Sequence, residues 1–236
     1  MEKINFEDRF EIYLFKEDQR THEASKLNEF ICFLKYTKAQ MPYKFSFSGS
    51  DAELLPELSL NENILLDFNS DSLTESKEVQ FQDFLRKPEN KHIEMLYRRL
   101  EHPHGQALLA NAQMKKLCSL IKAFLTDGQF IFLERPERAL SEEIFDLYQK
   151  ALKFHQQTKK VNIFISTDDE KRWSIHANNL VERSPDYSFK ISSLKKTLDW
   201  QQERAHFYKS KESKSNKNVL NFIIPAESSS SKKSVA

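Results

Sequence analysis

The sequence contains very little glycine. Only Gly49, Gly105 and Gly128 occur among 236 residues, whereas glycine makes up about 7% of average proteins. Glycine lets successive backbone N–H groups approach a phosphate and lets the chain turn through positive φ. The shortage therefore excludes a glycine-rich phosphate-binding loop.

An excess of charge of one sign is also missing. Lys and Arg number 36 and Asp and Glu number 35, which leaves a net charge of +1. No overall field would draw the chain to nucleic acid or anionic lipid, and we expect no nucleic-acid partner. No apolar run is long enough to span a bilayer, and residues 1–10 do not form a signal-peptide core. These absences predict a cytoplasmic protein.

Patterns that hold metals or form disulfides are absent as well. Cys32 and Cys118 lie in apolar stretches without a CxxC or a histidine at ligand spacing, so we expect two buried free thiols. His102 and His104 flank a proline without a third ligand, which favours a loop. We expect no metal site.

What is present is an alternation of apolar runs and helical patterns, with 39% hydrophobic residues to form a core. Four runs predict strands: residues 11–16, 44–48, 130–133 and 161–166. Helical periodicity predicts helices over residues 25–34, 111–124 and 141–156. The period of the first helix places Leu27, Phe30, Ile31 and Leu34 on one face. The alternation predicts an α/β fold with a parallel sheet.

The remaining segments complete one domain over residues 1–208. Residues from about 60 to 112 are mostly helical in pattern, with a break at Pro88, and predict a helical insertion. Residues 187–192 predict an edge strand, and residues 194–207 a closing helix with Trp200 on its inner face.

Residues 209–236 are rich in Ser and Lys and predict a disordered tail. Within the tail, residues 218–225 (NVLNFIIP) are β-prone. They either dock on a partner through Val219, Phe222 and Ile223 or pack back on their own domain.

Four segments follow the order, and nearly the spacing, of the motifs of ATP-binding cassettes. They are LLPELSLNEN (54–63), ANAQMKKLCSLIKAFL (110–125), FIFLERPERAL (130–140) and NIFISTDD (162–169). In that order they resemble the stretch after the Q-loop, the signature loop and helix, the Walker B strand with its D-loop, and the strand before the switch histidine. The resemblance covers about residues 10–185. It implies a P-loop NTPase-like (RecA-like) parallel sheet flanked by helices, with the helical insertion and a reduced antiparallel β part.

The resemblance places EDQRTHEAS (17–25) at the P-loop. In this register Glu17 and His22 stand at glycine positions, Glu23 replaces the lysine and Ala24 replaces the Mg²⁺-binding hydroxyl. A carboxylate in place of the lysine would repel a triphosphate by about 4 kcal/mol at ~4 Å and an effective dielectric near 20. The segment is therefore expected not to bind nucleotide.

The other motif positions also lack the residues that bind nucleotide or catalyse hydrolysis in the family. The resemblance puts Ser50 at the Q-loop glutamine, Glu134 at the Walker B aspartate, Arg135 at the catalytic glutamate and Asp168 at the switch histidine. Arginine stays protonated and cannot act as the general base. We therefore expect no catalytic residue and no cofactor, although weak ATP binding stays open.

The signature and D-loop positions also differ from the family. Asn111, Ala112 and Gln113 replace the signature Ser-Gly-Gly, and Ser141 replaces the D-loop aspartate. The antiparallel β subdomain is largely missing, which leaves Phe6 or Phe10 as candidates to stack on adenine.

Two structural interpretations stand beside these assignments. Asp168 and Asp169 follow a strand and fit a helix N-cap or first turn better than a metal or acid–base site. Glu134, Arg135, Glu137 and Arg138 fit an ion-pair cluster, either at a dimer interface or on an ordinary surface loop.

The resemblance with altered positions implies a non-catalytic (pseudo-ATPase) subunit that scaffolds or regulates an ABC transporter-like complex. Its expected partners are a competent ABC ATPase subunit or a second copy, and an integral membrane subunit docked beside Ser50, Leu54 and Leu55. It would then lie at the inner face of the membrane. The alternatives are a free-standing interaction module with an inherited cassette fold, or an ABC ATPase subunit with residual ATP binding.

Overall fold

The computed structural model describes residues 6, 10–16, 26–39, 41–69, 75–126, 128–184, 186 and 188–194. The chain divides into two units, Met1–Lys195 and Lys196–Ala236, and every described residue belongs to the first. The predicted P-loop segment, nearly all of the predicted closing helix and the tail with its 218–225 segment lie outside the described residues.

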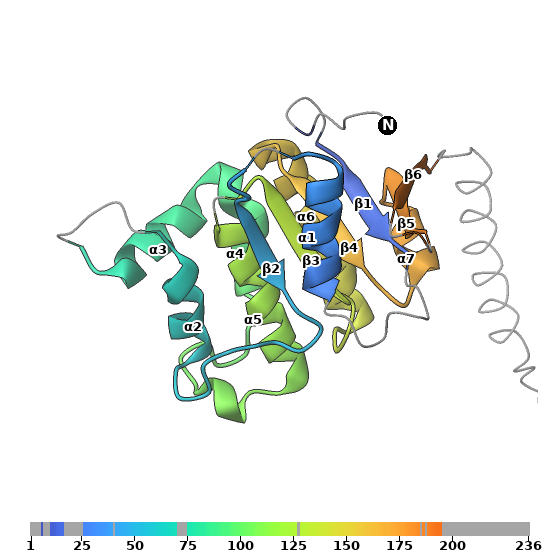
Figure 1. The fold of residues 1–236 in the computed structure, drawn as a ribbon. Coiled ribbons are helices and arrows are strands. Elements are labelled where there is room, and N and C mark those ends of the chain that lie inside the picture. Colours follow the sequence, from blue (N-terminus) through green and yellow to red (C-terminus); the bar gives the residue numbers. More distant parts are fainter. Residues whose placement is uncertain are drawn as a thin grey trace, which may run out of the picture. The chain divides into compact units, whose positions relative to one another are not determined.

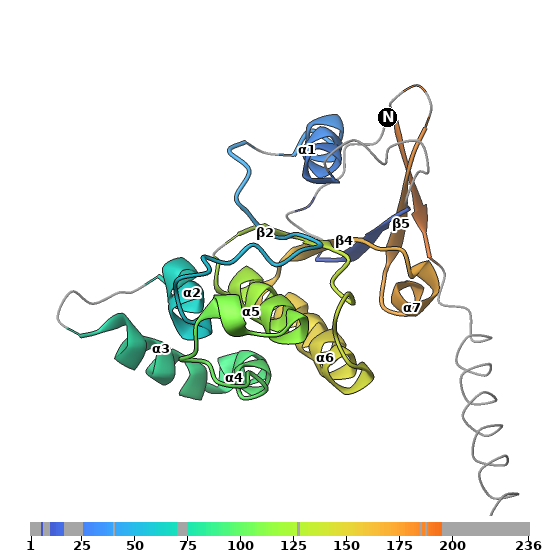
Figure 2. The same cartoon turned by 90° about the horizontal axis from the view of Figure 1, so that it is seen from below.

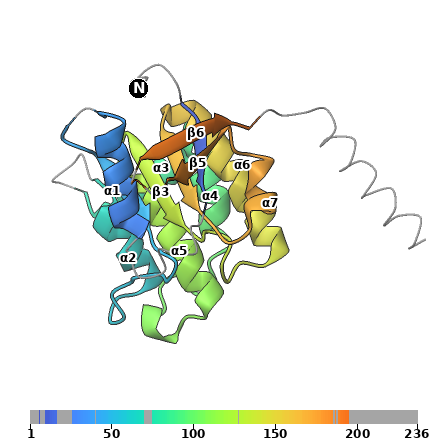
Figure 3. The same ribbon diagram turned by 45° about the vertical axis from the view of Figure 1, so that its right-hand side comes forward.

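A six-stranded sheet organises the first unit, in the order β2-β3-β4-β1-β5-β6 (Figure 1). The first five strands of this order are parallel, and β6 runs antiparallel to β5 at the edge (Figure 3). The strands are β1 (Ile12–Phe15), β2 (Phe45–Ser48), β3 (Phe130–Glu134), β4 (Asn162–Ser166), β5 (Asn179–Arg183) and β6 (Phe189–Ser193). The α/β fold with a mostly parallel sheet is as predicted.

The central strands are apolar throughout because helices cover both faces of the sheet. All residues of β1 and β4 are buried, as are the first four of β3. The strand β5 was not predicted, since Val181 is its only buried residue and its other positions are half-exposed. It pairs with β1, with Leu14 beside Leu180.

Helix α1 (Lys26–Tyr36) lies on one side of the sheet, and α5 (Ala112–Leu125) and α6 (Glu142–Lys159) lie on the other (Figure 2). The short helix α7 (Glu170–Ser174) joins β4 to β5. Ser46 and Ser48 of β2 face α5, because their hydroxyls bond the carbonyl of Ala123 and the hydroxyl of Ser119.

Helices also fill the stretch between β2 and β3. They are α2 (Leu60–Asp67), α3 (Lys77–Arg86), η2 (Pro88–Asn90), α4 (Lys91–Tyr97) and η3 (Ala107–Leu109). Pro88 lacks an N–H and starts the short turn η2, so α3 ends just before it. The insertion packs on the same core as α5 and α6, through buried residues such as Ile64, Phe81 and Leu96.

The two sides of the sheet have cores of different chemistry. The side of α5 and α6 is mostly aliphatic, whereas the side of α1 is almost entirely aromatic. In the aromatic layer Phe30 of α1 stacks on Phe132 of β3, with ring centroids 4.8 Å apart. Each layer is closed to solvent by helices from a different part of the chain.

The structure refines one prediction about α1 and contradicts another. Its buried hydrophobic residues are Phe30, Phe33 and Leu34; Leu27 and Ile31 are half-exposed, although Leu27 still packs against the aromatic layer. The helix is rotated so that its rings meet the phenylalanines of the sheet. Cys32, two positions from Phe30, then points to the opposite side and is exposed, whereas Cys118 is buried as predicted.

Candidate functional site

The candidate site lies where parallel strands end, at what we call the carboxyl edge: Ser48 of β2, Glu134 of β3 and Ser166 of β4. Ligands of open α/β sheets bind outside this edge. Ser50, Arg135 and Asp168 follow these strand ends, and Glu134 is itself the last residue of β3. Glu17, His22, Glu23 and Ala24, predicted to lie after β1, are outside the described residues, so their assignment stays a prediction.

Arg135 and Asp168 form an ion pair across this edge, with 2.9 Å between Nε and Oδ2. The strand register brings them together, because Glu134 of β3 lies beside Ser166 of β4. Arg135 has a left-handed backbone (φ 44°), and its N–H donates to the Ser166 carbonyl at 2.7 Å. The two positions that the resemblance assigns to the water-activating glutamate and the switch histidine therefore hold a guanidinium and a carboxylate that neutralise each other.

Lys116 of α5 was not predicted as a site residue. Its side chain is buried, and Nζ donates to the carbonyls of Gly49 at 2.6 Å, Glu134 at 3.0 Å and Ser50 at 3.3 Å. Burial lowers the pKa of Lys116 to about 8, against the opposing attraction of nearby carboxylates, of which Glu137 has the largest effect. The helical period could have singled it out, because Lys116 falls on the same face as the buried Leu120 and Ala123.

Three members of the predicted ion-pair cluster of Glu134, Arg135, Glu137 and Arg138 have partners outside it, Asp168 being the partner of Arg135. The Glu137 carboxylate accepts from the hydroxyl of Thr167 at 2.5 Å and from Nε1 of the buried Trp173 at 2.8 Å. Arg138 pairs with Asp51 at 3.1 Å. The turn after β3 is thus fastened to β4, α7 and the loop after β2.

The signature-like residues serve as the start of a helix. Asn111 is the N-cap of α5 and accepts from the N–H of Met114 at 2.8 Å, and Ala112 begins the helix. Gln113 accepts from the N–H of Ser141 at 2.7 Å, and Ser141 in turn caps α6. The Asn111 oxygen is therefore engaged by its own helix.

Asp169 is the N-cap of α7, where its carboxylate accepts from the N–H of Arg172 at 3.1 Å. This agrees with the predicted capping role. Phe6 cannot stack on a ligand, because it is buried in the aromatic layer against Phe130 and Phe164. The ring of Phe6 is part of the core, so the expectation that Phe6 could stack on adenine is wrong.

The loop of residues 49–58, which we call the β2 loop, contains the first half of the LLPELSLNEN segment (54–63) that contributes to the resemblance. Leu54 is half-buried against the aliphatic core, whereas Leu55 is 51% exposed. The buried Asn63 holds the backbone of Leu55, accepting from its N–H at 2.8 Å and donating to its carbonyl at 3.0 Å. Ser59 and Glu62 form a capping box that starts α2.

Two exposed leucines lie beside this loop and were not predicted. Leu108 is 63% and Leu109 81% exposed. The N–H of Leu108 donates to the carbonyl of Pro56 at 3.1 Å, which places η3 against the β2 loop. Together with Leu55 they give this end of the insertion an apolar surface.

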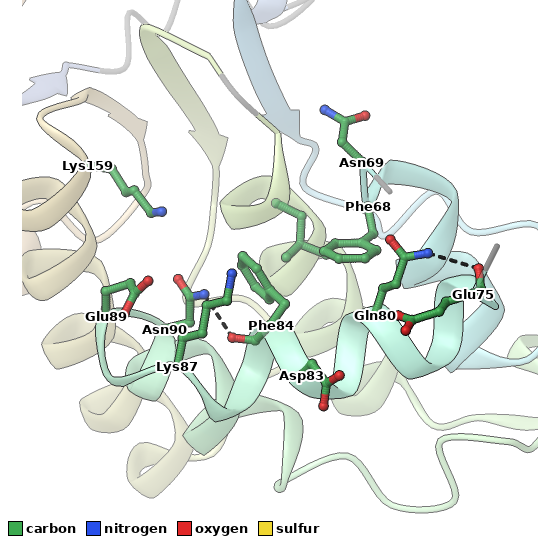
Figure 4. Close-up of a pocket in the computed structure, with 11 residues that line it drawn as sticks. Phe68, Asn69, Glu75, Gln80, Asp83, Phe84, Lys87, Glu89, Asn90 and Lys159 are labelled. Carbon is green, nitrogen blue, oxygen red and sulfur yellow. Dashed lines mark hydrogen bonds between the residues drawn. The ribbon is translucent and has the colours of Figure 1, made fainter. Parts of the chain in front are cut away.

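A cavity of about 390 Å³ lies away from the carboxyl edge, between the insertion and the ends of α5 and α6 (Figure 4). Phe68 and Phe84 form its apolar wall, and side chains of both signs, such as Lys87 and Asp83, surround it. Asn90 donates to the Phe84 carbonyl at 2.9 Å. Nothing in the sequence resemblance assigns a role to this cavity.

Within the described ranges no group of three or more His, Cys, Asp or Glu side chains is placed to hold a metal ion. In the same ranges no helix has the length and apolar character needed to cross a membrane.

No family model and no curated protein matches the sequence. Solved structures do match. The chain is similar to a dimeric ATP-binding cassette bound to ADP and Pi, with a TM-score of 0.60 and 13% identity, over 80% of this chain and 87% of that chain. It is also similar to the ATP-binding subunit of an ABC transporter, with a TM-score of 0.58 and 15% identity, over 79% and 80% of the two chains.

The fold is therefore that of an ABC transporter ATP-binding cassette: a P-loop NTPase-type sheet flanked by helices, with a helical insertion. The low identities restrict this finding to the fold.

Proposed function

We propose that the chain is a non-catalytic subunit of an ABC transporter-like complex, which it scaffolds or regulates without hydrolysing ATP. The observation that carries this proposal is the ion pair of Arg135 with Asp168. The guanidinium of Arg135 cannot accept a proton from water. It also pairs with the carboxylate of Asp168, which follows β4. The sequence of residues 17–25, which offers Glu23 in place of a phosphate-binding lysine, supports the same conclusion.

Nucleotide binding tests the proposal directly. Calorimetry with ATP, with and without Mg²⁺, is expected to show no binding at millimolar nucleotide, and a phosphate-release assay no turnover. A competent cassette in the same assays serves as the positive control. Micromolar binding that is lost when residues 17–25 are replaced would overturn the proposal.

The proposed partners are a competent ABC ATPase subunit or a second copy, together with an integral membrane subunit that would hold the chain at the inner face of the membrane. The exposed Leu55, with Leu108 and Leu109 beside it, is the proposed contact for the membrane subunit. Ser50 is less suited, since its carbonyl already bonds Lys116, and Leu54 is half-buried.

Co-purification from solubilised membranes tests this assignment. Leu55→Asp and Leu109→Asp are expected to abolish capture of a membrane subunit. Val79→Asp is the matched control, because Val79 of α3 is also 51% exposed. Capture of a soluble partner instead, lost on deletion of residues 209–236, would favour the interaction-module alternative.

A further inference from the structure

Three backbone carbonyls from two strand ends converge on one buried ammonium. Gly49 and Ser50 follow β2, Glu134 ends β3, and Nζ of Lys116 bonds all three at 2.6, 3.3 and 3.0 Å. A lysine ammonium has three protons to donate and no acceptor. The ammonium of Lys116 therefore has one N–H group for each of the three carbonyl oxygens.

The surroundings of Lys116 favour a positive charge at this point. The charged groups that face it are Glu134 on β3, Glu137 and Arg138 in the following turn, and Asp51 on the β2 loop. Three of these are carboxylates and one is a cation. Burial opposes them and lowers the pKa to about 8, so the group is an ammonium at neutral pH and an amine in alkaline solution.

The β2 loop has separate fastenings at its two ends. Asn63 clamps the backbone of Leu55 at the far end. At the near end, the loop is held by Lys116 and by the ion pair of Asp51 with Arg138, in which the Asp51 side chain is largely exposed and contributes little. Loss of Lys116 would release the near end and leave the far end in place.

We propose that Lys116 is a positioning residue. Its buried ammonium holds the near end of the β2 loop against the end of β3 and so fixes the conformation of the loop at the carboxyl edge. The inference goes beyond the proposed function, because it concerns the loop whether or not Leu55 contacts a partner. Micromolar nucleotide binding, which would overturn the proposed function, and a negative result in the test below are therefore independent outcomes.

Spin-label mobility on the full chain tests this role. A nitroxide is placed at Glu53→Cys, near the Lys116 end, or at Glu57→Cys, beyond Leu55, in a Cys32→Ser background. Cys118 remains, because its thiol is buried. Lys116→Met is expected to shorten the rotational correlation time at position 53 by about threefold, as for a released loop. Position 57 should be unchanged, and Lys116→Arg should restore the immobile spectrum.

Lys115→Met is the matched control, since Lys115 is the neighbouring lysine and bonds only the Leu108 carbonyl among the contacts shown here. It is expected to leave both labels unchanged. No effect of Lys116→Met at position 53, or equal loosening at positions 53 and 57, would overturn the proposal.

A pH titration of the chain labelled at position 53 tests the charge of Lys116 without removing its side chain. Between pH 7 and 9 the label at position 53 should become mobile in the chain with Lys116 and stay immobile with Lys116→Arg, because carboxylates and arginine do not titrate in this range as residue types. Identical pH profiles in the two chains would mean that the charge of Lys116 does not hold the loop.

Discussion

Lowering the pH from 7 to 5 is expected to remove about 4 kcal/mol from the free energy of unfolding, because two buried histidines stay neutral in the folded chain. His92 of α4 and His155 of α6 are both almost fully buried, with 2.9 Å between Nε2 and Nδ1. The ring of Phe124 stacks on His155 with centroids 4.5 Å apart. The pair joins the helical insertion to the helix beneath the sheet.

Burial is the main reason why protonation of this pair is unfavourable. It lowers the pKa of His92 to about 4, with a smaller contribution from the charge of Lys159. Burial, followed by the neighbouring His92 and by Lys159, lowers the pKa of His155 to about 3. In the unfolded chain both imidazoles titrate near 6.5.

The lowered pKa values of His92 and His155 decide how stability changes with pH. Below pH 6.5 the unfolded chain takes up protons that the folded chain does not, so the stability is complete above that pH and falls as the pH drops. Each imidazole contributes up to about 1.4 kcal/mol per pH unit, and the two together up to about 2.7 kcal/mol. Integration from pH 7 to 5 gives the loss of about 4 kcal/mol, a large part of a total of about 5–15 kcal/mol.

Urea denaturation followed by circular dichroism at pH 7 and 5 measures this loss. In His92→Gln/His155→Gln the pH-dependent part of the stability should shrink by at least half, whatever the stability at pH 7. Carboxylates such as Glu62 and Glu94, whose pKa values are lowered by hydrogen bonds, also contribute to acid loss, and the comparison with the variant subtracts them. His104→Gln, at an exposed position, is the control. An equal loss in wild type and double variant would refute the reasoning.

Three further predictions concern stability, measured by the same denaturation at pH 7. Asn63→Leu should cost about 2–4 kcal/mol, because it leaves the N–H of Leu55 without its partner and removes the bonds of the Asn63 amide to the carbonyls of Leu55 and Ser59; a cost below about 1 kcal/mol would contradict the clamp. Ser59→Ala should cost about 1 kcal/mol through loss of the capping box, and an unchanged midpoint would argue against it. Phe30→Ala should cost about 3–5 kcal/mol, whereas Phe154→Ala, at a partly exposed ring, should cost far less; similar costs would contradict the aromatic layer.

The strands and helix starts that could be predicted share a local signal. The apolar runs of β3 and β4 reflect burial on both faces, and a polar side chain such as Ser141 or Asp169 marks a helix start through its own backbone. β5 has no such signal, because it sits near the edge and buries only Val181. Its place is decided by pairing with β1, which depends on residues more than 160 positions away.

The candidate site, too, has features that the sequence predicts and features that only the fold determines. The sequence identifies Arg135 and Asp168 as replacements, but only the register of β3 and β4 brings them into an ion pair. Lys116 and Lys115 are adjacent and chemically identical. The helical period favours Lys116 for burial, but only the packing of α5 brings its ammonium to the carbonyls of Gly49, Ser50 and Glu134. Pairings between side chains that depend on strand register or helix rotation cannot be predicted from composition or spacing.

The unlike cores on the two sides of the sheet allow two separate optical reporters. Trp173 lies in the aliphatic layer with its ring edge-on to Phe145, whereas the aromatic layer around Phe30 and Phe132 is built from phenylalanine and tyrosine. With Trp200 replaced by phenylalanine, indole fluorescence would follow the α5–α6 face of the sheet, and a fluorescent label on the exposed Cys32 of α1 would follow the other face. Loosening of α1 and loosening of the α5–α6 side could then be timed independently in the same protein.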